Sequence, residues 1–241
     1  MIDTGPALEI LYRDEHYIAV NKPSGMLVHR TELAEQQGVF AMMKLRDQIG
    51  QHVFTCHRLD RPTSGVLIFG LSAEAGHKLQ MKFADKTIFK KYLAVVRGYT
   101  SDEAIRLDKP VKSRYESEAK DAVTSFKTIA KVELPIPVGP YETARYSLVE
   151  AYPETGRTHQ IRIHLKSLNH PIVGDTRYGD GRHNKMIQDK FGNNRLLLHA
   201  EELSFEHPFT GELVKLHADM PSEMNKVLEE IGLVSPTVPI E

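Results

Sequence analysis

The sequence has few of the features that mark secreted or membrane-bound chains. Cys56 is the only cysteine, so an intrachain disulfide is excluded and an oxidising compartment is not implied. No segment approaches the ~20 apolar residues of a membrane-spanning helix, and the first ten residues lack the basic start and apolar run of a signal peptide. We therefore expect a cytoplasmic protein without membrane contact.

A net charge is also lacking. Lys and Arg total 31 and Asp and Glu total 32, so the net charge of −1 neither supports nor excludes binding to nucleic acid. Several cations nevertheless gather in one part of the chain, where they would form a basic face for phosphates or an ordinary solvated face of mixed charge. They are Arg58, Arg61, Lys82, Lys86, Lys90, Lys91 and Arg97.

Length and composition predict the domain organisation. A chain of 241 residues that is 41% apolar suits one compact domain, residues 1–241, rather than two independent folds. We find no internal repeat and no low-complexity tract.

Periodicity of the apolar residues predicts the elements of the first half of the chain. A short hairpin comes first, and a helix ends before Gly50, a suitable residue for a left-handed helix end. A continuous apolar run then predicts a strand buried on both faces, and Ser72 is placed to cap the helix that follows it. The predicted elements are strands 10–12 and 17–20, helix 38–49, strand 66–69, helix 72–86 and strand 88–96.

The second half is richer in predicted strands. Residues 101–121 are polar and irregular, and a helix from Thr158 to Asn169 is preferred over a strand, although Ile161, Ile163 and Leu165 alternate as in a strand. The other predicted elements are strands 122–132, 144–151 and 196–200, a hairpin of 203–206 with 212–216, and a helix after Ala218. This order indicates an α+β protein with a mixed, mostly antiparallel sheet and flanking helices.

The segment before the buried strand concentrates ionisable groups where a core begins. Residues 57–65 read HRLDRPTSG, with Asp60 just before an Arg-Pro pair. Local chemistry alone favours a turn or cap role for this aspartate, because Asp is common in turns that contain Pro and Gly. The segment by itself therefore leaves a catalytic role open.

Four ordered segments carry a resemblance to a known family. The segment HRLDRPTSGVLIFG resembles the catalytic signature of the RluA-type pseudouridine synthases, and residues 20–29, 90–98 and 155–164 resemble three further family segments in the same order. Residues 198–200 and 207–212 extend the similarity over about 9–219. The resemblance implies a synthase catalytic domain with a core of about 9–219, a central catalytic cleft, and isomerisation of uridine in RNA.

The resemblance also implies roles for individual residues. Asp60 corresponds to the essential carboxylate, and Arg162 to its cationic partner; burial disfavours an ionised carboxylate, and a nearby guanidinium compensates. Tyr92 is expected against the uracil, which must leave its stack in the RNA to be reached. Arg58 is expected to help displace that base, and His57 to contribute to base binding.

Each of these residues also has an alternative interpretation. Arg162 would suit the polar surface of its helix, and Tyr92 would suit a strand in the core. Lys22 and the loop after it are expected to border the site, with no chemical step assigned to them.

Finer similarity concerns the RNA substrate. Residues 46–55 and Arg30 resemble the branch of the family that acts on uridine 65 of tRNA. The first matching strand begins near residue 9, so we expect no N-terminal S4-like RNA-binding domain, and a monomer that binds tRNA through its catalytic domain. The alternatives are a synthase acting on ribosomal RNA and a non-catalytic RNA-binding module.

No cofactor or metal is expected, because the isomerisation consumes neither electrons nor phosphate. The pairs His52 with His57 and His159 with His164 suggest a metallohydrolase, but they lack the grouping of three or four ligands that zinc requires. Cys56 beside His57 suggests a thiol nucleophile. Neighbouring residues of an extended segment point to opposite faces, so a buried apolar role is preferred for the cysteine.

Overall fold

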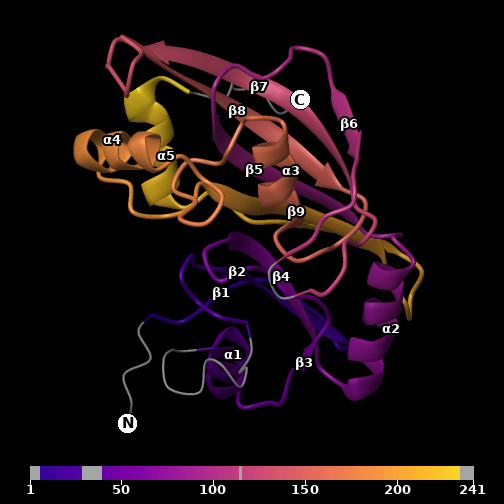
Figure 1. Cartoon of the computed structure of the whole chain (residues 1–241). Coiled ribbons are helices and arrows are strands. Elements are labelled where there is room, and N and C mark those ends of the chain that lie inside the picture. Colours follow the sequence, from indigo (N-terminus) through magenta and orange to yellow (C-terminus); the bar gives the residue numbers. More distant parts are fainter. Residues whose placement is uncertain (1–5, 29–39, 114–115, 234–241) are drawn as a thin grey trace, which may run out of the picture. The chain divides into compact units, whose positions relative to one another are not determined.

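The computed structural model describes residues 6–28, 40–113 and 116–233; Arg30 and the Pro-containing tail lie outside them. The chain forms two compact units, drawn in Figure 1. Unit 1 comprises residues 1–90 and 200–219, and unit 2 comprises 91–199 and 220–241. Each unit therefore combines two separate stretches of the chain, and the expected single domain with a central cleft stays a prediction.

Unit 1 is built around strand β4 (Ser64–Gly70), all seven residues of which are buried. Its neighbour β2 runs antiparallel to it and pairs with β1 to form the predicted hairpin. The long strand β9 pairs with β10 in a second hairpin. The remaining elements of this unit have the following bounds: β1 Glu9–Arg13, β2 Tyr17–Lys22, α1 Ala41–Ile49, β3 Phe54–Thr55, α2 Ala73–Ala84, β9 Leu198–Glu206 (from Ala200 on) and β10 Leu213–His217.

The predicted Ser72 cap and Gly50 helix end of unit 1 are confirmed, but α1 begins at Ala41 rather than near residue 38, and α2 ends at Ala84 rather than near residue 86. The Ser72 side chain accepts a hydrogen bond from the Ala75 amide and caps α2. Gly50 ends α1 in the left-handed conformation, with φ 65°. Ala75 and Leu79 of α2 pack in one core with Val66 and Ile68 of β4. The intervening Leu67 and Phe69 are buried as well, so the run 66–69 is apolar on both faces.

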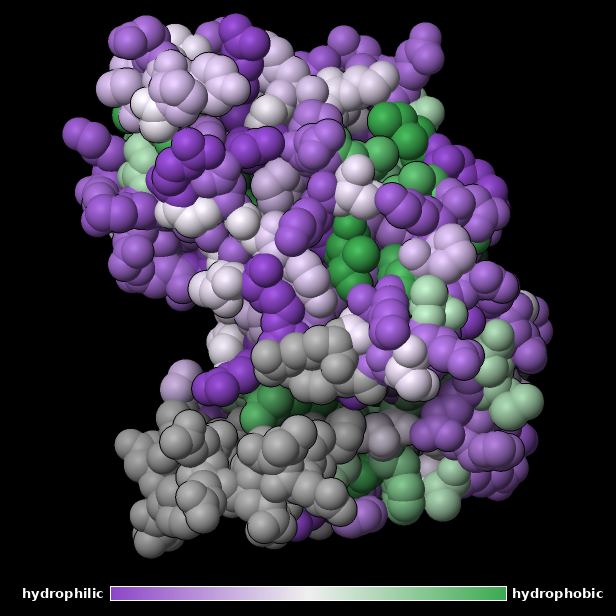
Figure 2. All heavy atoms as spheres, viewed as in Figure 1, coloured by the Kyte–Doolittle hydropathy of each residue, from purple (hydrophilic) through white to green (hydrophobic). Residues whose placement is uncertain are grey.

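Unit 2 contains an antiparallel sheet in the order β5-β8-β7-β6. Its elements are β5 Phe89–Arg97 (from Lys91 on), β6 Ile105–Asp108, β7 Val123–Leu134, β8 Ala144–Pro153, α3 Gln160–Ser167, α4 Gly181–Phe191 and α5 Ser222–Ile231. On the face shown in Figure 2, hydrophilic side chains cover most of the described surface. None of the helices in the described part of the chain has the length and apolar character needed to span a bilayer.

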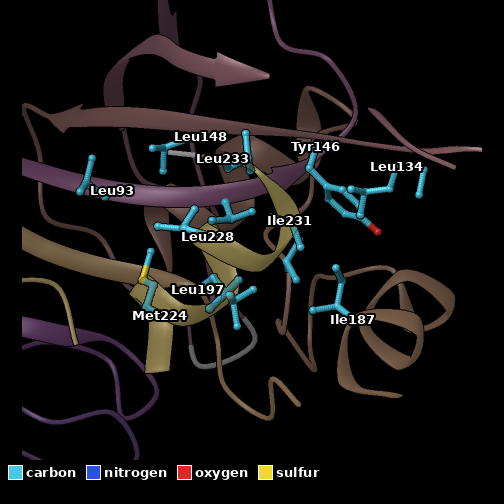
Figure 3. Close-up of a cluster of buried hydrophobic side chains, with 14 of the residues drawn as sticks. Leu93, Leu134, Tyr146, Leu148, Ile187, Leu197, Met224, Leu228, Ile231 and Leu233 are labelled. Carbon is cyan, nitrogen blue, oxygen red and sulfur yellow. The ribbon is translucent and has the colours of Figure 1, made fainter. Parts of the chain in front are cut away.

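Strand β5 divides unit 2 into two cores. Leu93 and Val95 belong to the core on the side of α4 and α5, which also contains Ile187, Met224 and Leu228. Figure 3 shows Leu93, Leu228 and Met224 at one end of this core and Ile187 at the other. The alternate residues, including Tyr92, point to the opposite side, where α3 packs with Ile161 and Leu165. The α3 face is therefore the face of the sheet that carries Tyr92.

The structure confirms the α+β class and corrects several local predictions. The described residues contain ten strands and five helices. The pairs β1–β2, β2–β4, β3–β4, β5–β8, β6–β7, β7–β8 and β9–β10 are antiparallel. Residues 101–121 were expected to be irregular, but 105–108 pair with β7 as strand β6. The predicted strands 196–200 and 203–206 are largely one strand, and helix α4 was not predicted because its sequence is mostly polar.

The start of α3 also differs from the prediction. The helix is confirmed, but its cap residue is His159, in the left-handed conformation with φ 58°, and no side chain caps it. Thr158 lies one residue earlier, in a turn. The prediction failed because a Thr cap requires extended backbone next to the first helical residue, whereas His159 occupies that place with positive φ.

We predict that Gly65→Ala destabilises unit 1 strongly. Gly65 has φ 115°, and a Cβ there would lie 2.1 Å from the Ala200 carbonyl oxygen. Strain and overlap together should lower the free energy of unfolding by more than about 2 kcal/mol in urea denaturation. Gly50→Ala is the matched control: it also has positive φ but meets no atom within 4 Å, so it should cost only about 1–2 kcal/mol. Equal losses in the two variants would contradict the overlap.

Candidate functional site

Three of the predicted site residues lie on one loop of unit 1, residues 56–63, between β3 and β4. Asp60 is half-buried and Arg58 is exposed. The Asp60 carbonyl accepts a 3.1 Å hydrogen bond from the Thr63 amide, which closes a tight turn just before β4. The turn predicted from local chemistry is therefore present, and it holds the Asp60 backbone at the end of a fully buried strand.

The buried Lys22 side chain binds backbone carbonyls of the loop that carries Asp60. It is fully buried at the end of β2, and its Nζ donates to the carbonyls of Pro23 (2.9 Å), Met26 (2.9 Å) and Arg61 (3.2 Å). Burying an ammonium group is costly unless oxygen acceptors replace the water molecules that hydrated it. Here these acceptors are carbonyls of residues 23–26 and of the loop that carries Asp60. The cation therefore joins residues 23–26 to the segment that carries Asp60.

Further hydrogen bonds join the same two loops. The Gly25 amide donates to the Arg61 carbonyl, and Arg61 Nε donates back to the Gly25 carbonyl, both at 2.9 Å. The Ser24 hydroxyl donates to the Pro62 carbonyl at 2.7 Å. Residues 23–26, which belong to the segment that resembles the family, thus support the loop that carries Asp60.

His57 is engaged within unit 1. Its Nε2 accepts a 3.1 Å hydrogen bond from the Ile68 amide, and its ring stacks on Phe83 with centroids 4.6 Å apart. Burial, with a smaller contribution from the charge of Lys90, lowers the pKa of His57 to about 3. Burial also lowers the pKa of Lys90 to about 8. The imidazole is therefore neutral at physiological pH and supports β4 as an acceptor, so its expected contact with the base stays a prediction.

Tyr92 and Arg162 both belong to unit 2. Tyr92 is partly buried on β5, opposite Ala151 of β8, and packs against the core beneath α3. Arg162 lies on α3 next to Ile161, which belongs to the same core. The structure thus places both residues on the α3 side of the sheet and supports the core interpretation of Tyr92 in part.

Arg162 is not a surface residue. It is 5% exposed, and its guanidinium makes two bonds to Asp175: Nε to Oδ2 at 2.7 Å and Nη2 to Oδ1 at 2.9 Å. Asp175 was not predicted as a site residue, because it lies in a stretch of the sequence without predicted elements. The signal available was a Gly-Asp pair after the apolar run 171–173, which alone indicates only a turn.

The other polar residues of segment 155–164 hold strands together. Gln160 Nε2 donates to the Val123 carbonyl and to the Thr124 hydroxyl, both at 2.9 Å. His164 is fully buried between the Thr124 hydroxyl and the Lys109 carbonyl, each 2.9 Å from a ring nitrogen. Burial lowers the pKa of His164. These two residues therefore fasten α3 to β7 and to the segment after β6.

Asp60, His57 and Arg58 thus lie on one loop of unit 1, whereas Tyr92 and Arg162 belong to β5 and α3 of unit 2. The expected meeting of Asp60 with Arg162 and Tyr92 stays a prediction. Within the ranges described, no group of three His, Cys, Asp or Glu residues is arranged to hold a metal. Burial raises the pKa of Cys56 to about 12, which leaves the thiol protonated and unsuited to nucleophilic attack.

We predict that Lys22→Met loosens the loop that carries Asp60. The variant keeps the length of the side chain but leaves the carbonyls of Pro23, Met26 and Arg61 without their ammonium donor, so the free energy of unfolding should fall by about 1–3 kcal/mol. Amide hydrogen exchange should also accelerate at Gly25 and Thr63. Lys226→Met, at a 70% exposed side chain, should change the free energy of unfolding by less than about 0.5 kcal/mol. Unchanged exchange at Gly25 and Thr63 would refute the anchoring role.

A second prediction concerns pH. The unfolded chain protonates His57 below its ordinary pKa of ~6.5, whereas the folded chain does so only near pH 3, so this group contributes stability that is lost as the pH falls from about 6.5 towards 3. In His57→Gln the amide oxygen can still accept from Ile68 but does not titrate. Urea denaturation between pH 7 and 4.5 should therefore show a shallower loss of stability in the variant. Identical slopes in the two proteins would disprove the neutral, buried state of His57.

Comparison with known proteins identifies the family to which this chain belongs. Residues 16–167, which include Asp60, Tyr92 and Arg162, match the family model described as RNA pseudouridylate synthase. The chain is 51% identical over 222 residues to the tRNA pseudouridine synthase C of Vibrio parahaemolyticus, with 88% of this chain and 90% of the relative covered. It is 46% identical over 235 residues to the protein of that name from Haemophilus influenzae, with 93% and 98% covered.

Solved structures show the same fold. Human RNA pseudouridylate synthase domain containing 1 superposes with a TM-score of 0.68 at 27% identity, covering 89% of this chain and 84% of the human chain. Human RNA pseudouridylate synthase domain containing 4 gives a TM-score of 0.72 at 24% identity, with 93% of both chains covered, which bears on the fold alone. Together, the matched family model, the close bacterial relatives and the shared fold establish that the chain belongs to the RNA pseudouridylate synthase family.

Proposed function

We propose that this protein isomerises uridine to pseudouridine in tRNA, at uridine 65, with Asp60 as the catalytic carboxylate. The observation that carries the proposal is the support of Asp60: in a chain of the synthase family, a half-buried carboxylate sits on a loop tied to the buried Lys22 by backbone carbonyls. Such support limits the movement of the reacting group and lowers the entropic part of the barrier.

The reaction needs a carboxylate and little else. The bond between uracil N1 and ribose C1′ breaks, the base turns, a bond forms between C5 and C1′, and the proton lost from C5 is balanced by one gained at N1. Asp60 acts either as a nucleophile or as a base on the sugar. No electrons are transferred, so the proposal requires no cofactor and no metal.

The other predicted residues have complementary roles in this proposal. Arg162 compensates the negative charge of Asp60, and Tyr92 lies against the extruded uracil, where an aromatic face provides about 1–3 kcal/mol of stacking. Arg58, which is exposed on the Asp60 loop, contributes to displacing the base from the RNA helix, and His57 of the same loop contributes to binding the base. We propose that both units act as a single catalytic domain in a cytoplasmic monomer.

The choice of tRNA rests on the relatives. Proteins that are 46–51% identical over most of the chain carry the name tRNA pseudouridine synthase C. Position 65 rests on the resemblance of residues 46–55 to the branch that modifies this uridine. A target in ribosomal RNA is the competing possibility, and mapping pseudouridine in both RNA classes from a strain that lacks this protein separates the two.

We predict that Asp60→Asn abolishes isomerisation. Wild type should release tritium from tRNA labelled at uracil C5, without added metal and in the presence of a chelator. The amide can act neither as nucleophile nor as base, so the rate should fall by more than about 10³-fold while tRNA binding is largely retained. Asp85→Asn, at an exposed aspartate of the same unit, is the matched control and should be as active as wild type.

Two outcomes of this assay would count against the proposal. Full activity of Asp60→Asn would exclude the carboxylate mechanism and favour another catalytic group. Undiminished tritium release from a tRNA that has cytidine at position 65 would exclude that position as the target.

A further inference from the structure

Arg162 contacts two residues, Asp175 and Tyr178, to which the proposed reaction assigns no chemical step. We propose that Asp175 and Tyr178 are positioning residues that together set the orientation of the Arg162 guanidinium for catalysis. This inference rests on the proposed function, in which Arg162 compensates Asp60. It goes beyond that function because it assigns a role to two residues of the segment between α3 and α4.

Asp175 fixes the plane of the guanidinium. Its side chain is fully buried and binds two adjacent nitrogens of Arg162, Nε at 2.7 Å and Nη2 at 2.9 Å. A two-point bond between planar groups aligns their planes and leaves no rotation about the pair axis. It uses two of the five N–H groups of an arginine and thereby determines where the Nη1 edge points.

Asp175 is itself immobilised by its own loop. Its Oδ1 also accepts from the amides of Arg177 (2.9 Å) and Tyr178 (3.0 Å). Burial by itself raises the pKa of Asp175, but the bonds from Arg162 and from these amides outweigh it and hold the pKa below its ordinary value. The carboxylate therefore stays ionised and presents both oxygens in fixed directions.

Helix α4 holds the loop from the other side. Asn184 Nδ2 donates to the Asp175 carbonyl at 3.0 Å, and Asn184 Oδ1 accepts from the Gly174 amide at 2.8 Å. Gly174 has φ 77°, and a Cβ there would lie 1.8 Å from the Arg195 carbonyl oxygen. The bonds from Asn184 and the close packing at Gly174 therefore restrict the backbone on both sides of the Gly174–Asp175 peptide.

The Tyr178 ring limits movement of the Arg162 guanidinium perpendicular to the guanidinium plane. The Arg162 Cζ lies 5.1 Å from the centroid of the Tyr178 ring, within the range of a cation–π contact. The Tyr178 hydroxyl is 3.0 Å from His159 Nδ1, at the start of α3. The ring is therefore joined to the helix that carries Arg162. The Asp175 carboxylate limits rotation of the Arg162 guanidinium within its plane, and the Tyr178 ring limits its movement out of that plane.

Such support matters because an arginine side chain has many rotamers. This rotamer freedom must be lost before the guanidinium is available in one orientation. A side chain that is already oriented loses this freedom on folding instead of during the reaction, and misplacement by about 1 Å can cost about 10²-fold in rate. Asp175 and Tyr178 thus affect the chemical step without touching the substrate.

The test is a mutant cycle read by single-turnover tritium release from tRNA labelled at uracil C5. Asp175→Asn removes the charge and one of the two bonds to Arg162, and should lower the rate by about 10- to 100-fold with little change in the Kd for tRNA. In an Arg162→Lys background, where the ammonium cannot make the two-point bond, the same change should lower the rate by less than about threefold. A merely structural role would give the full loss in both backgrounds.

Two further variants guard against misfolding as the cause. Asp180→Asn is the matched control, because it breaks another Asp–Arg pair of unit 2, Asp180 with Arg97 at 2.7 Å, and keeps a side chain able to cap α4; its rate should be close to that of wild type. Tyr178→Leu removes the half-buried ring and leaves the Asp175 bonds intact. It should react more slowly than Tyr178→Phe, with circular dichroism and thermal midpoint matching in that pair.

Each result has a distinct meaning. If wild type is active and Asp60→Asn is not, a wild-type rate in Asp175→Asn overturns this inference alone. An equal loss of rate on changing Asp175 in the wild-type and Arg162→Lys backgrounds also overturns it. If Asp175→Asn fails to fold, equal rates of Tyr178→Leu and Tyr178→Phe overturn it instead. If wild type releases no tritium, or Asp60→Asn releases as much, the proposed function fails and takes this inference with it.

Discussion

The Asp60 loop depends on a buried ammonium group. Lys22 is fully enclosed, and backbone carbonyls of two loops replace the water it loses on folding. Because the cost of burying a cation is offset only while those oxygens stay in place, the cation enforces the conformation of both loops at once. A neutral side chain would leave the carbonyls without that donor and the loops without that restraint.

Unit 2 solves the same problem with a different cation. Arg162 is buried, and a carboxylate rather than carbonyls supplies the oxygens. The difference follows from the chemistry: a guanidinium is planar and pairs with a carboxylate at two points, whereas an ammonium donates hydrogen bonds to oxygens in several directions. Lys22 therefore organises a loop around a point, and Asp175 organises the plane of a side chain.

The remaining polar residues of the family segments serve the scaffold. His57 accepts from the Ile68 amide, Gln160 bridges to β7, and His164 bridges β7 and the segment after β6. In each case a buried polar group finds a partner, as the cost of leaving it unsatisfied demands. Several residues in the segments that resemble the family thus have structural contacts. Only some residues of each motif are available to take part in the reaction.

The sequence by itself determined the elements whose signal is local. The run 66–69 predicts a strand buried on both faces, Ser72 predicts a helix start, and the ordered motifs indicate the family and the carboxylate. Tertiary structure decided what depends on distant partners: β6 is a strand because β7 pairs with it, and α4 is stable because one face reaches a core that its polar sequence barely signals. Asp175 became visible only through Arg162, thirteen residues away, because a two-point bond depends on positions in space, to which periodicity along the chain is blind.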